Sequence, residues 1–260
     1  MIFVTGASGN VGREVVRELK KLKIKFRVGV RADDQNTQVG NTSSVVFDFL
    51  DPSTFSAAVE GCKAVFLLRP PAISNTKATL NVLIDIARRS GVKHIVFISV
   101  AGAARNPLVP HHAVEQHLIA GPTDWTILRP GFFTQNLGDA YREDIRHDSR
   151  IYLPAGSARV AFIDARDIAA VAVTALTNPA EYSRKTYMLT GPQALSFAEV
   201  TAILSENLDR AIIYQPASIL GYMWHLLARG MPITQVLVQT ILHVGLRFGQ
   251  AEIVDDTLDV

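Results

Sequence analysis

The sequence predicts an α/β protein built on a doubly wound parallel sheet, followed by a small C-terminal α/β region. Short apolar runs rich in Val, Ile and Phe alternate with segments of helical spacing, which favours a parallel sheet covered on both faces. The alternation begins with a strand at Ile2–Thr5 and a helix at Asn10–Leu22. Because parallel crossovers are right-handed, repeating this unit places helices on both faces of one sheet.

The other elements of the first half follow in order. Strands are expected at Phe26–Val30, Val45–Asp48, Ala64–Leu68, His94–Ser99 and Trp125–Leu128. Helices are expected after Pro52, at Thr76–Arg89 and at His111–Ala120. One face of the helix Thr76–Arg89 carries Leu80, Leu83, Ile84 and Ala87. Gly91 then stands where a C-terminal glycine cap belongs.

Beyond Pro130 the pattern loosens, with strands expected at Ala161–Asp164, Thr186–Leu189 and Ile212–Tyr214. Helices are expected at Asp167–Leu176, Phe197–Leu208, Ile219–Ala228 and Ile233–Val244. No linker or repeat interrupts the chain, so we expect one domain over residues 1–260. Its core spans 1–130, and 131–260 add some strands and the substrate-binding part.

The last helix has an apolar face that consists of Ile233, Val236, Leu237, Thr240, Ile241 and Val244. Packing into the core is the expected role of this face. A substrate lid or a surface for a partner is the alternative.

Composition limits the class of protein. The 260 residues are 48% hydrophobic and 19% charged, as in an ordinary globular protein. A net charge of +2 argues against nucleic-acid binding, and no apolar run reaches the ~18 residues of a membrane span. The single Cys62 permits no internal disulfide, and the N-terminus enters a strand directly. We expect a cytoplasmic protein, monomer or dimer, without a metal site.

The first strand leads into a turn made of Gly6, Ala7, Ser8, Gly9, Asn10, Val11 and Gly12. Gly6 permits a sharp turn, Gly9 permits close approach of a pyrophosphate, and Gly12 permits close packing of helix on sheet. The amides and dipole of the helix N-terminus favour the diphosphate charge. Although the spacing is G-x-x-G-x-x-G, its place between strand and helix predicts an NAD(P) site with all seven residues in contact.

The end of the second strand indicates which dinucleotide binds. No acidic residue stands there to hold a ribose 2′-hydroxyl, and Arg31 follows Val30 instead. A guanidinium suits a 2′-phosphate, so the sequence favours NADP. Asp33 and Asp34 lie close behind and can still serve a ribose, so NAD stays open.

Two further strand ends are expected to contact the cofactor. Asp48 can accept from the adenine amino group, and Phe49 can lie along the base. Leu68, at the end of the strand Ala64–Leu68, is included among the expected contacts.

Five stretches now resemble the atypical, NmrA-like branch of the short-chain dehydrogenases/reductases. They are Val4–Gly12, His94–Ser99, Leu128–Phe133, Phe162–Ala169 and Tyr187–Gly191, and they follow the family's order over a span of about 190 residues. The resemblance implies a Rossmann-type NAD(P)-binding sheet, a small C-terminal substrate region and, often, NADPH-dependent reduction of quinones, dyes or other conjugated acceptors. Some relatives bind the dinucleotide as sensors.

One departure from the family bears on catalysis. Active short-chain enzymes usually carry Tyr-x-x-x-Lys, and none of the six tyrosines here has Lys four residues later. In the family's register, Pro107 takes the place of the Tyr and His111 that of the Lys. The resemblance thus makes His111 a ribose, substrate or catalytic contact, with His112 as the alternative. Ser99, in the family's serine region, is either catalytic or a loop cap.

Loss of the tyrosine acid affects the choice of substrate. A ketone becomes a basic alkoxide that needs a positioned acid, whereas a quinone or dye becomes a delocalised anion that water can protonate. We therefore expect an NADPH-dependent oxidoreductase that transfers hydride to a small apolar or conjugated acceptor. The alternative is a non-catalytic NAD(P)-binding redox sensor.

Overall fold

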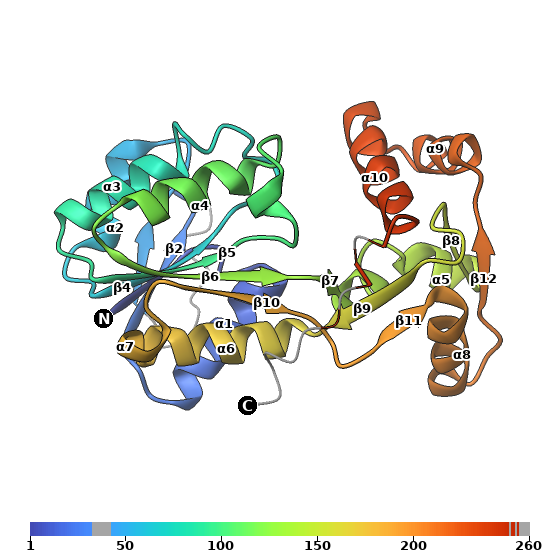
Figure 1. Cartoon of the computed structure of the whole chain (residues 1–260), viewed down its shortest axis with the longest axis horizontal. Helices are drawn as coiled ribbons and strands as arrows, with labels where there is room; N and C mark the ends of the chain where they lie inside the picture. The colour runs from blue at the N-terminus through green and yellow to red at the C-terminus, as the bar shows by residue number, and fades with distance from the viewer. Residues whose placement is uncertain (33–42, 250, 253, 255–260) are drawn as a thin grey trace. The chain divides into compact units, whose positions relative to one another are not determined.

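Seven parallel strands form the main sheet of the computed structural model, in the order β10-β6-β5-β4-β1-β2-β3 (Figure 1). The structure describes residues 1–32, 43–249, 251–252 and 254. The strands are β1 Ile2–Val4, β2 Phe26–Val30, β3 Ser43–Val46, β4 Ala64–Leu68, β5 His94–Ile98, β6 Asp124–Pro130 and β10 Lys185–Leu189. The chain proceeds outward from β1 in both directions, which is the doubly wound topology that the alternation predicts.

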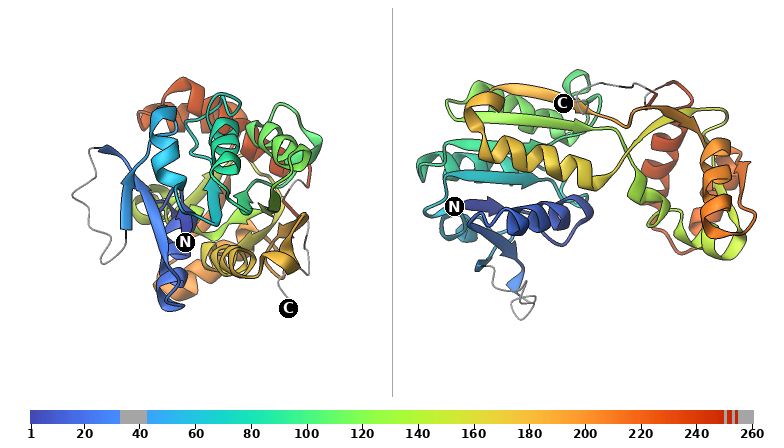
Figure 2. Two further views of the ribbon diagram at one scale, coloured as in Figure 1. Left: turned by 90° about the vertical axis from the view of Figure 1, so that its left-hand side faces the viewer. Right: turned by 90° about the horizontal axis from the view of Figure 1, so that it is seen from below.

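Helices cover both faces of this sheet, with α2, α3 and α4 on one side and α1 and α6 on the other (Figure 1). The views in Figure 2 show α1 and α6 side by side, and the two helices are in contact. The helices of this unit are α1 Asn10–Lys21, α2 Phe55–Val59, α3 Leu80–Arg89, α4 Pro110–Ala120, α6 Ala165–Thr177 and α7 Pro179–Tyr182. The all-parallel order brings the carboxyl ends of the strands to one edge, where ligands bind in such sheets.

The helix α3 illustrates how the apolar spacing creates this packing. Leu80, Leu83, Ile84 and Ala87 are all buried, as the spacing predicts. Gly91 has a φ of +85°, the left-handed conformation in which a C-terminal glycine cap costs no Cβ strain. The preceding residues 76–79 form turns rather than the first turn of the helix.

The contacts within the chain separate it into two compact units. The first holds residues 1–130 and 165–189, and the second holds 131–164 and 190–260. The expected core of residues 1–130 is thus completed by α6, α7 and β10, and β10 pairs with β6 from Lys185–Thr126 to Leu189–Pro130. In the described part of the second half, a single strand, β10, joins the main sheet, and α6 supplies the helical crossover that this parallel edge strand needs.

The second unit is a small α/β assembly with its own core. β9 Arg159–Ile163 pairs with β7 Phe132–Phe133 and antiparallel with β11 Ala194–Ser196, and β8 Arg150–Leu153 pairs with β12 Ile213–Pro216. Its helices are α5 Arg142–Asp148, α8 Phe197–Leu208, α9 Ile219–Ala228 and α10 Ile233–Leu246. Across the described residues, no helix is long and apolar enough to cross a membrane.

The face of α10 differs from the expectation. Val236, Thr240 and His243 point into the core of the second unit, whereas Ile233, Leu237 and Ile241 are exposed. The expected face was wrong because α10 is apolar around most of its circumference, so spacing alone does not identify the buried side.

Candidate functional site

The glycine-rich turn stands at the carboxyl edge of the main sheet, directly after β1. The Thr5 hydroxyl anchors it, because Oγ1 donates to the Phe66 carbonyl at 3.1 Å and accepts from the Leu68 amide at 2.9 Å. These two bonds tie the end of β1 to the end of β4 where the turn begins. Leu68 therefore lies beside the turn, and a Cβ on Gly6 would come within 3.2 Å of its side chain.

The three glycines of the turn differ in what the protein itself requires. Gly6 has a φ of +64°, a conformation that L side chains rarely adopt. A Cβ on Gly12 would lie 2.0 Å from the Gly6 carbonyl oxygen, so the close helix–sheet packing excludes any side chain there. A Cβ on Gly9 would meet only that same oxygen, at an ordinary 3.5 Å, among the described residues, and Gly9 has a φ of −79°. The fold does not explain why Gly9 lacks a side chain, whereas close approach of a ligand does.

The helix α1 that follows begins without the groups that usually satisfy a helix N-terminus. Gly9 is its N-cap residue, no side chain of residues 1–32 caps its first amides, and its first turn holds no acidic residue. Amides at this position have no partner inside the helix, and the helix dipole adds positive potential. Ser8 and Gly9 are exposed, so these donors face an accessible edge. The arrangement suits a diphosphate.

Of the residues expected to contact the adenosine part of the cofactor, Arg31 and Asp48 are exposed and Phe49 is buried. Arg31 is exposed directly after β2, and Asp48 is exposed with its Oδ1 accepting from the Leu50 amide at 2.9 Å. The expected contact of Phe49 with the base does not fit, because its side chain is 6% exposed and packs edge-on against Phe47 in the core. β3 ends at Val46, two residues earlier than expected, so Asp48 lies beyond the strand and not at its end. Asp33 and Asp34 lie outside the described residues.

A buried ion pair holds the carboxyl ends of β5 and β6 to α4. Glu115 accepts from Arg129 through Nε at 2.9 Å and Nη2 at 2.6 Å, and from the Ser99 hydroxyl at 2.5 Å. The Glu115 side chain is completely buried. Ser99 is 1% exposed and its hydroxyl is already donating, so its contacts fit the cap-like alternative better than a catalytic role.

His111, in the first turn of α4, is held in one tautomer by a neighbouring arginine. Arg69 Nε donates to His111 Nε2 at 3.2 Å, and Arg69 Nη1 is fixed by the carbonyls of Pro70, Pro71 and Ile73. An accepting Nε2 places the proton of a neutral imidazole on Nδ1. Among the described residues, this buried Nδ1 has no hydrogen-bond partner. A buried donor without an acceptor costs about 1–3 kcal/mol, which a ligand oxygen would offset.

His112 does not share this environment. Its Nδ1 lies 2.9 Å from the carbonyl oxygen of Ala103, so it holds the preceding loop. Pro107 lies in that loop before α4 and has no donor. Of the two candidate histidines, His111 is therefore the one whose buried nitrogen is left for a ligand.

Acid should destabilise the folded state through His111. Burial, with a smaller contribution from the Arg69 charge, lowers the His111 pKa from 6.5 to about 4. The unfolded chain therefore takes up a proton near pH 6.5 that the folded chain refuses until about pH 4, so stability is complete above pH 6.5 and falls between these values. We expect His111→Gln to remove up to about 3 kcal/mol of this pH dependence.

Urea unfolding of wild type and His111→Gln at pH 8, 6 and 4.5 measures this difference. The exposed His147→Gln variant is the control for removing a histidine. Parallel curves of stability against pH for wild type and His111→Gln would contradict the assignment.

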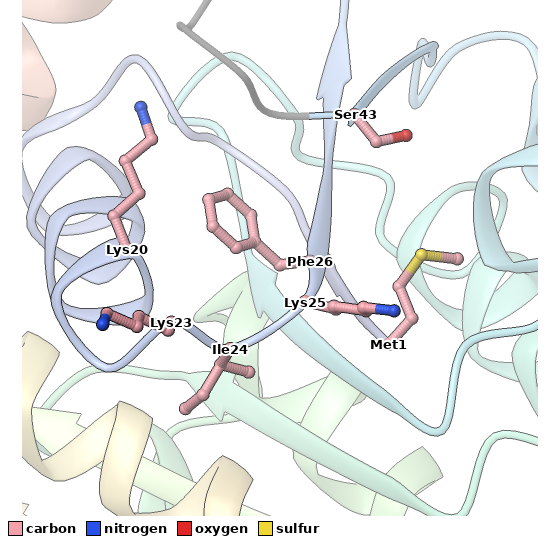
Figure 3. Close-up of a pocket in the computed structure, with 7 residues that line it drawn as sticks. All are labelled: Met1, Lys20, Lys23, Ile24, Lys25, Phe26 and Ser43. Carbon is pink, nitrogen blue, oxygen red and sulfur yellow. The ribbon is translucent and has the colours of Figure 1, made fainter.

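A hollow beside the sheet lies away from these residues. It has a volume of about 510 Å³ and is lined by Met1, Lys20, Lys23, Ile24, Lys25, Phe26 and Ser43 (Figure 3). Met1, Phe26 and Ser43 stand at the starts of β1, β2 and β3, so the hollow is at the amino edge, opposite the glycine-rich turn. Its cations are surface lysines, and nothing about them indicates a built site.

A comparison with protein families decides the class. A family model described as NAD(P)H-binding matches residues 6–179, which begins at the glycine-rich turn and covers most of the first unit. The chain belongs to this NAD(P)H-binding family. The doubly wound sheet is therefore the family's cofactor-binding fold, and NAD(P)H is its cofactor.

Comparisons with individual proteins extend the likeness. The chain is 37% identical over 238 residues to NAD(P)H azoreductase of Xenophilus azovorans, covering 89% of this chain and 82% of that protein. The crystal structure of Citrobacter sp. triphenylmethane reductase complexed with NADP(H) has a TM-score of 0.87 at 26% identity, covering 100% and 94% of the two chains.

A third neighbour is NmrA, a negative transcriptional regulator solved with NADP. Its TM-score is 0.77 at 16% identity, covering 100% of this chain and 86% of that one, and this likeness concerns the fold alone. With the two reductases, it confirms the resemblance to the NmrA-like branch.

The residues present fit the family's cofactor. Gly9 has no side chain to block a ligand, and the uncapped N-terminus of α1 has amides that can donate to an anion. The Nδ1 proton of His111 can donate to a ligand oxygen. All three lie in the first unit, on segments that begin at the carboxyl ends of its strands.

Sequence reasoning missed Arg69, Glu115 and Arg129. The sequence does contain a signal for Glu115 and for Arg129. Arg129 follows the apolar pair Ile127 and Leu128 near the end of its strand, and an arginine that is largely buried requires a partner. Glu115 follows His111 by four residues, so both occupy the same face of α4. Arg69 gave no signal, because its role arises from folding back on its own loop.

Proposed function

We propose that this protein is an NADPH-dependent reductase that transfers hydride to a small conjugated acceptor of the dye or quinone class. The observation that carries the proposal is Gly9, which is exposed. The fold has room for a Cβ at this position. A dinucleotide bound at close range would leave no such room. The azoreductase and triphenylmethane reductase relatives support the acceptor class, because both are named for conjugated dyes.

The residues of the first unit divide the work of holding the cofactor. The amides from Ala7 to Gly12 bind the diphosphate, and Arg31 pairs with the 2′-phosphate. Asp48 accepts from the adenine amino group with its second carboxylate oxygen. His111 donates from Nδ1 to an oxygen of the nicotinamide ribose or of the acceptor. Bound NADPH supplies the hydride.

No proton donor is required at the acceptor in this mechanism. The protein lacks Tyr-x-x-x-Lys, and His111 stays neutral until about pH 4, so neither supplies a proton near pH 7. Ser99 is given no part in proton transfer, because its hydroxyl donates to Glu115. A quinone or azo acceptor that takes up hydride becomes an anion whose charge is spread over its conjugated system, and water supplies the proton; a cationic triarylmethane dye becomes neutral on taking up hydride and needs no proton.

Removing the charge of Arg31 should weaken NADPH more than NADH. Only NADPH carries the 2′-phosphate, and at this exposed position a guanidinium–phosphate contact is worth about 1.5 kcal/mol, or about tenfold in Kd. Fluorescence titration of Arg31→Ala with both cofactors measures the ratio. Arg17→Ala, on the exposed side of α1, is the control. An unchanged NADPH/NADH ratio in Arg31→Ala would remove Arg31 from the site.

A turnover assay tests the function itself. Purified protein is mixed with NADPH and with azo dyes, triphenylmethane dyes or quinones in turn, and loss of the reduced-nicotinamide absorbance is followed. We expect turnover with at least one conjugated class and none with simple ketones. Binding of NADPH without oxidation by any acceptor would instead favour the sensor.

The sensor is the second candidate function. It is favoured by the missing Tyr-x-x-x-Lys pair, since a protein that only binds the dinucleotide needs no acid. The regulator NmrA, solved with NADP, shares the fold of this chain, which is consistent with a sensor. Equal affinity for oxidised and reduced cofactor would count against it, because a redox sensor must distinguish the two states.

A further inference from the structure

Two neighbouring helices of the second unit contain no charged residue. Neither α9, with sequence ILGYMWHLLA, nor α10, with sequence ITQVLVQTILHVGL, contains Asp, Glu, Lys or Arg. The two helices contact one another and are joined by Arg229–Pro232. A surface helix normally carries charged residues on its outer side, and a helix that is apolar all round is normally buried.

The inner sides of these helices already have a role. Tyr222 and Leu226 of α9 and Val236 and Leu246 of α10 are buried in the core of the second unit. On α10, His243 is buried too, with Nε2 2.5 Å from the Tyr141 hydroxyl and Nδ1 2.7 Å from the Gln239 carbonyl oxygen. The core therefore accounts for one side of each helix and leaves the other unexplained.

The outer sides expose a large amount of apolar surface. Leu220 and Trp224 are each 74% exposed on α9, and Ile241 is 70% exposed on α10. The other exposed apolar residues of the pair are Ile219, Leu227, Ile233, Leu237, Val238 and Leu242. Together they expose on the order of 1,000 Å², more than the roughly 300–600 Å² of the largest patch on a monomer. A stable protein interface buries about 800 Å² per partner.

We propose that the outer face of α9 and α10 is the interface with a second copy of this chain. Two identical uncharged faces are complementary without any pairing of opposite charges, and twofold dimers are the commonest soluble oligomers. The exposed area matches what one subunit of such a dimer contributes.

The cations that flank the face argue against a lipid surface or an acidic partner. Arg229 pairs with Asp144 at 2.6 Å and with Asp148 at 3.1 Å, and Arg247 donates to the Pro154 carbonyl at 2.7 Å. Helices that bind membranes instead present free Lys and Arg beside their apolar side.

The test is the mass of the full-length protein in solution, measured by sedimentation velocity without cofactor. We expect wild type to be a dimer at 5 µM. Trp224→Glu and Ile241→Glu should each raise the dimer dissociation constant by about 100-fold or more, because each buries an unpaired charge at the interface. Leu108→Glu is the matched control, since Leu108 is 91% exposed in the first unit, and it should remain a dimer. Circular dichroism checks that every variant is folded.

Several results would overturn the proposal. Wild type could be monomeric at 50 µM, or both glutamate variants could remain dimers. A monomer that sediments with anionic vesicles would assign the face to lipid. Variants that lose dye reduction while keeping the dimer mass would assign it to a substrate lid. Because mass is measured without NADPH or acceptor, failure of the reductase proposal leaves this test intact.

Discussion

Glu115→Ala is expected to lower the free energy of unfolding by about 3–5 kcal/mol, because it breaks a buried ion pair. The carboxylate accepts two bonds from Arg129 and one from Ser99, and its side chain is wholly buried. Removing it leaves a partly buried guanidinium and a buried hydroxyl without their acceptor. Urea unfolding monitored by circular dichroism measures the loss.

The control for this prediction is Glu143→Ala. Glu143 also forms an ion pair, with His147 at 3.1 Å, but both side chains are more than half exposed. Such pairs contribute about 0–1 kcal/mol, so Glu143→Ala should change stability little. If Glu115→Ala also changed stability by less than about 1 kcal/mol, the ion pair would not hold α4 to the carboxyl edge.

Gly9→Ser should separate binding from stability. The backbone at Gly9, with φ −79° and ψ 173°, suits a serine N-cap, and its side chain would accept from the uncapped amides of α1. We expect unchanged or slightly higher stability. The added side chain occupies the space of the diphosphate and competes for its amides, so the Kd for NADPH should rise by about 10–100-fold.

Gly12→Ala is the opposite case in the same turn. Its Cβ would stand 2.0 Å from the Gly6 carbonyl oxygen, so the turn must shift. Overpacking of this kind costs about 1–3 kcal/mol or more, and we expect both stability and binding to fall. Thermal unfolding and cofactor titration of both variants measure the contrast. Equal NADPH affinity for Gly9→Ser and wild type would mean that Gly9 has no role in binding.

The elements that sequence predicts well are those whose packing is governed by local spacing. β2, β4, α8 and α9 have the predicted bounds, and α3 buries the predicted face. The glycine-rich turn was predictable because Gly6 and Gly12 are required by the strand–turn–helix context itself, while Gly9 stands where that context brings a ligand close. The parallel arrangement of the strands followed from the alternation of strands and helices along the sequence.

The parts that sequence does not predict depend on contacts between distant residues. The polar helix α5 and the short strand β8 have no clear periodicity, so packing within the second unit decides them. From the sequence, Phe49 fits a base contact as well as a core position. Its packing against Phe47, which in turn packs against Phe55, places it in the core. The Arg69–His111 bond joins residues 42 positions apart, and no local pattern signals it.

In the proposed binding mode, main-chain amides at the start of α1 hold the diphosphate of NADPH. Amide chemical shifts of ¹⁵N-labelled protein, followed during an NADPH titration, test it most directly. We expect the largest shifts at the amides of Ser8, Gly9, Val11 and Gly12, with downfield proton shifts from new charge-assisted hydrogen bonds. This binding mode would be contradicted if the largest shifts lay around Lys20, Lys23 and Lys25 at the opposite edge, or if the folded protein showed no shifts.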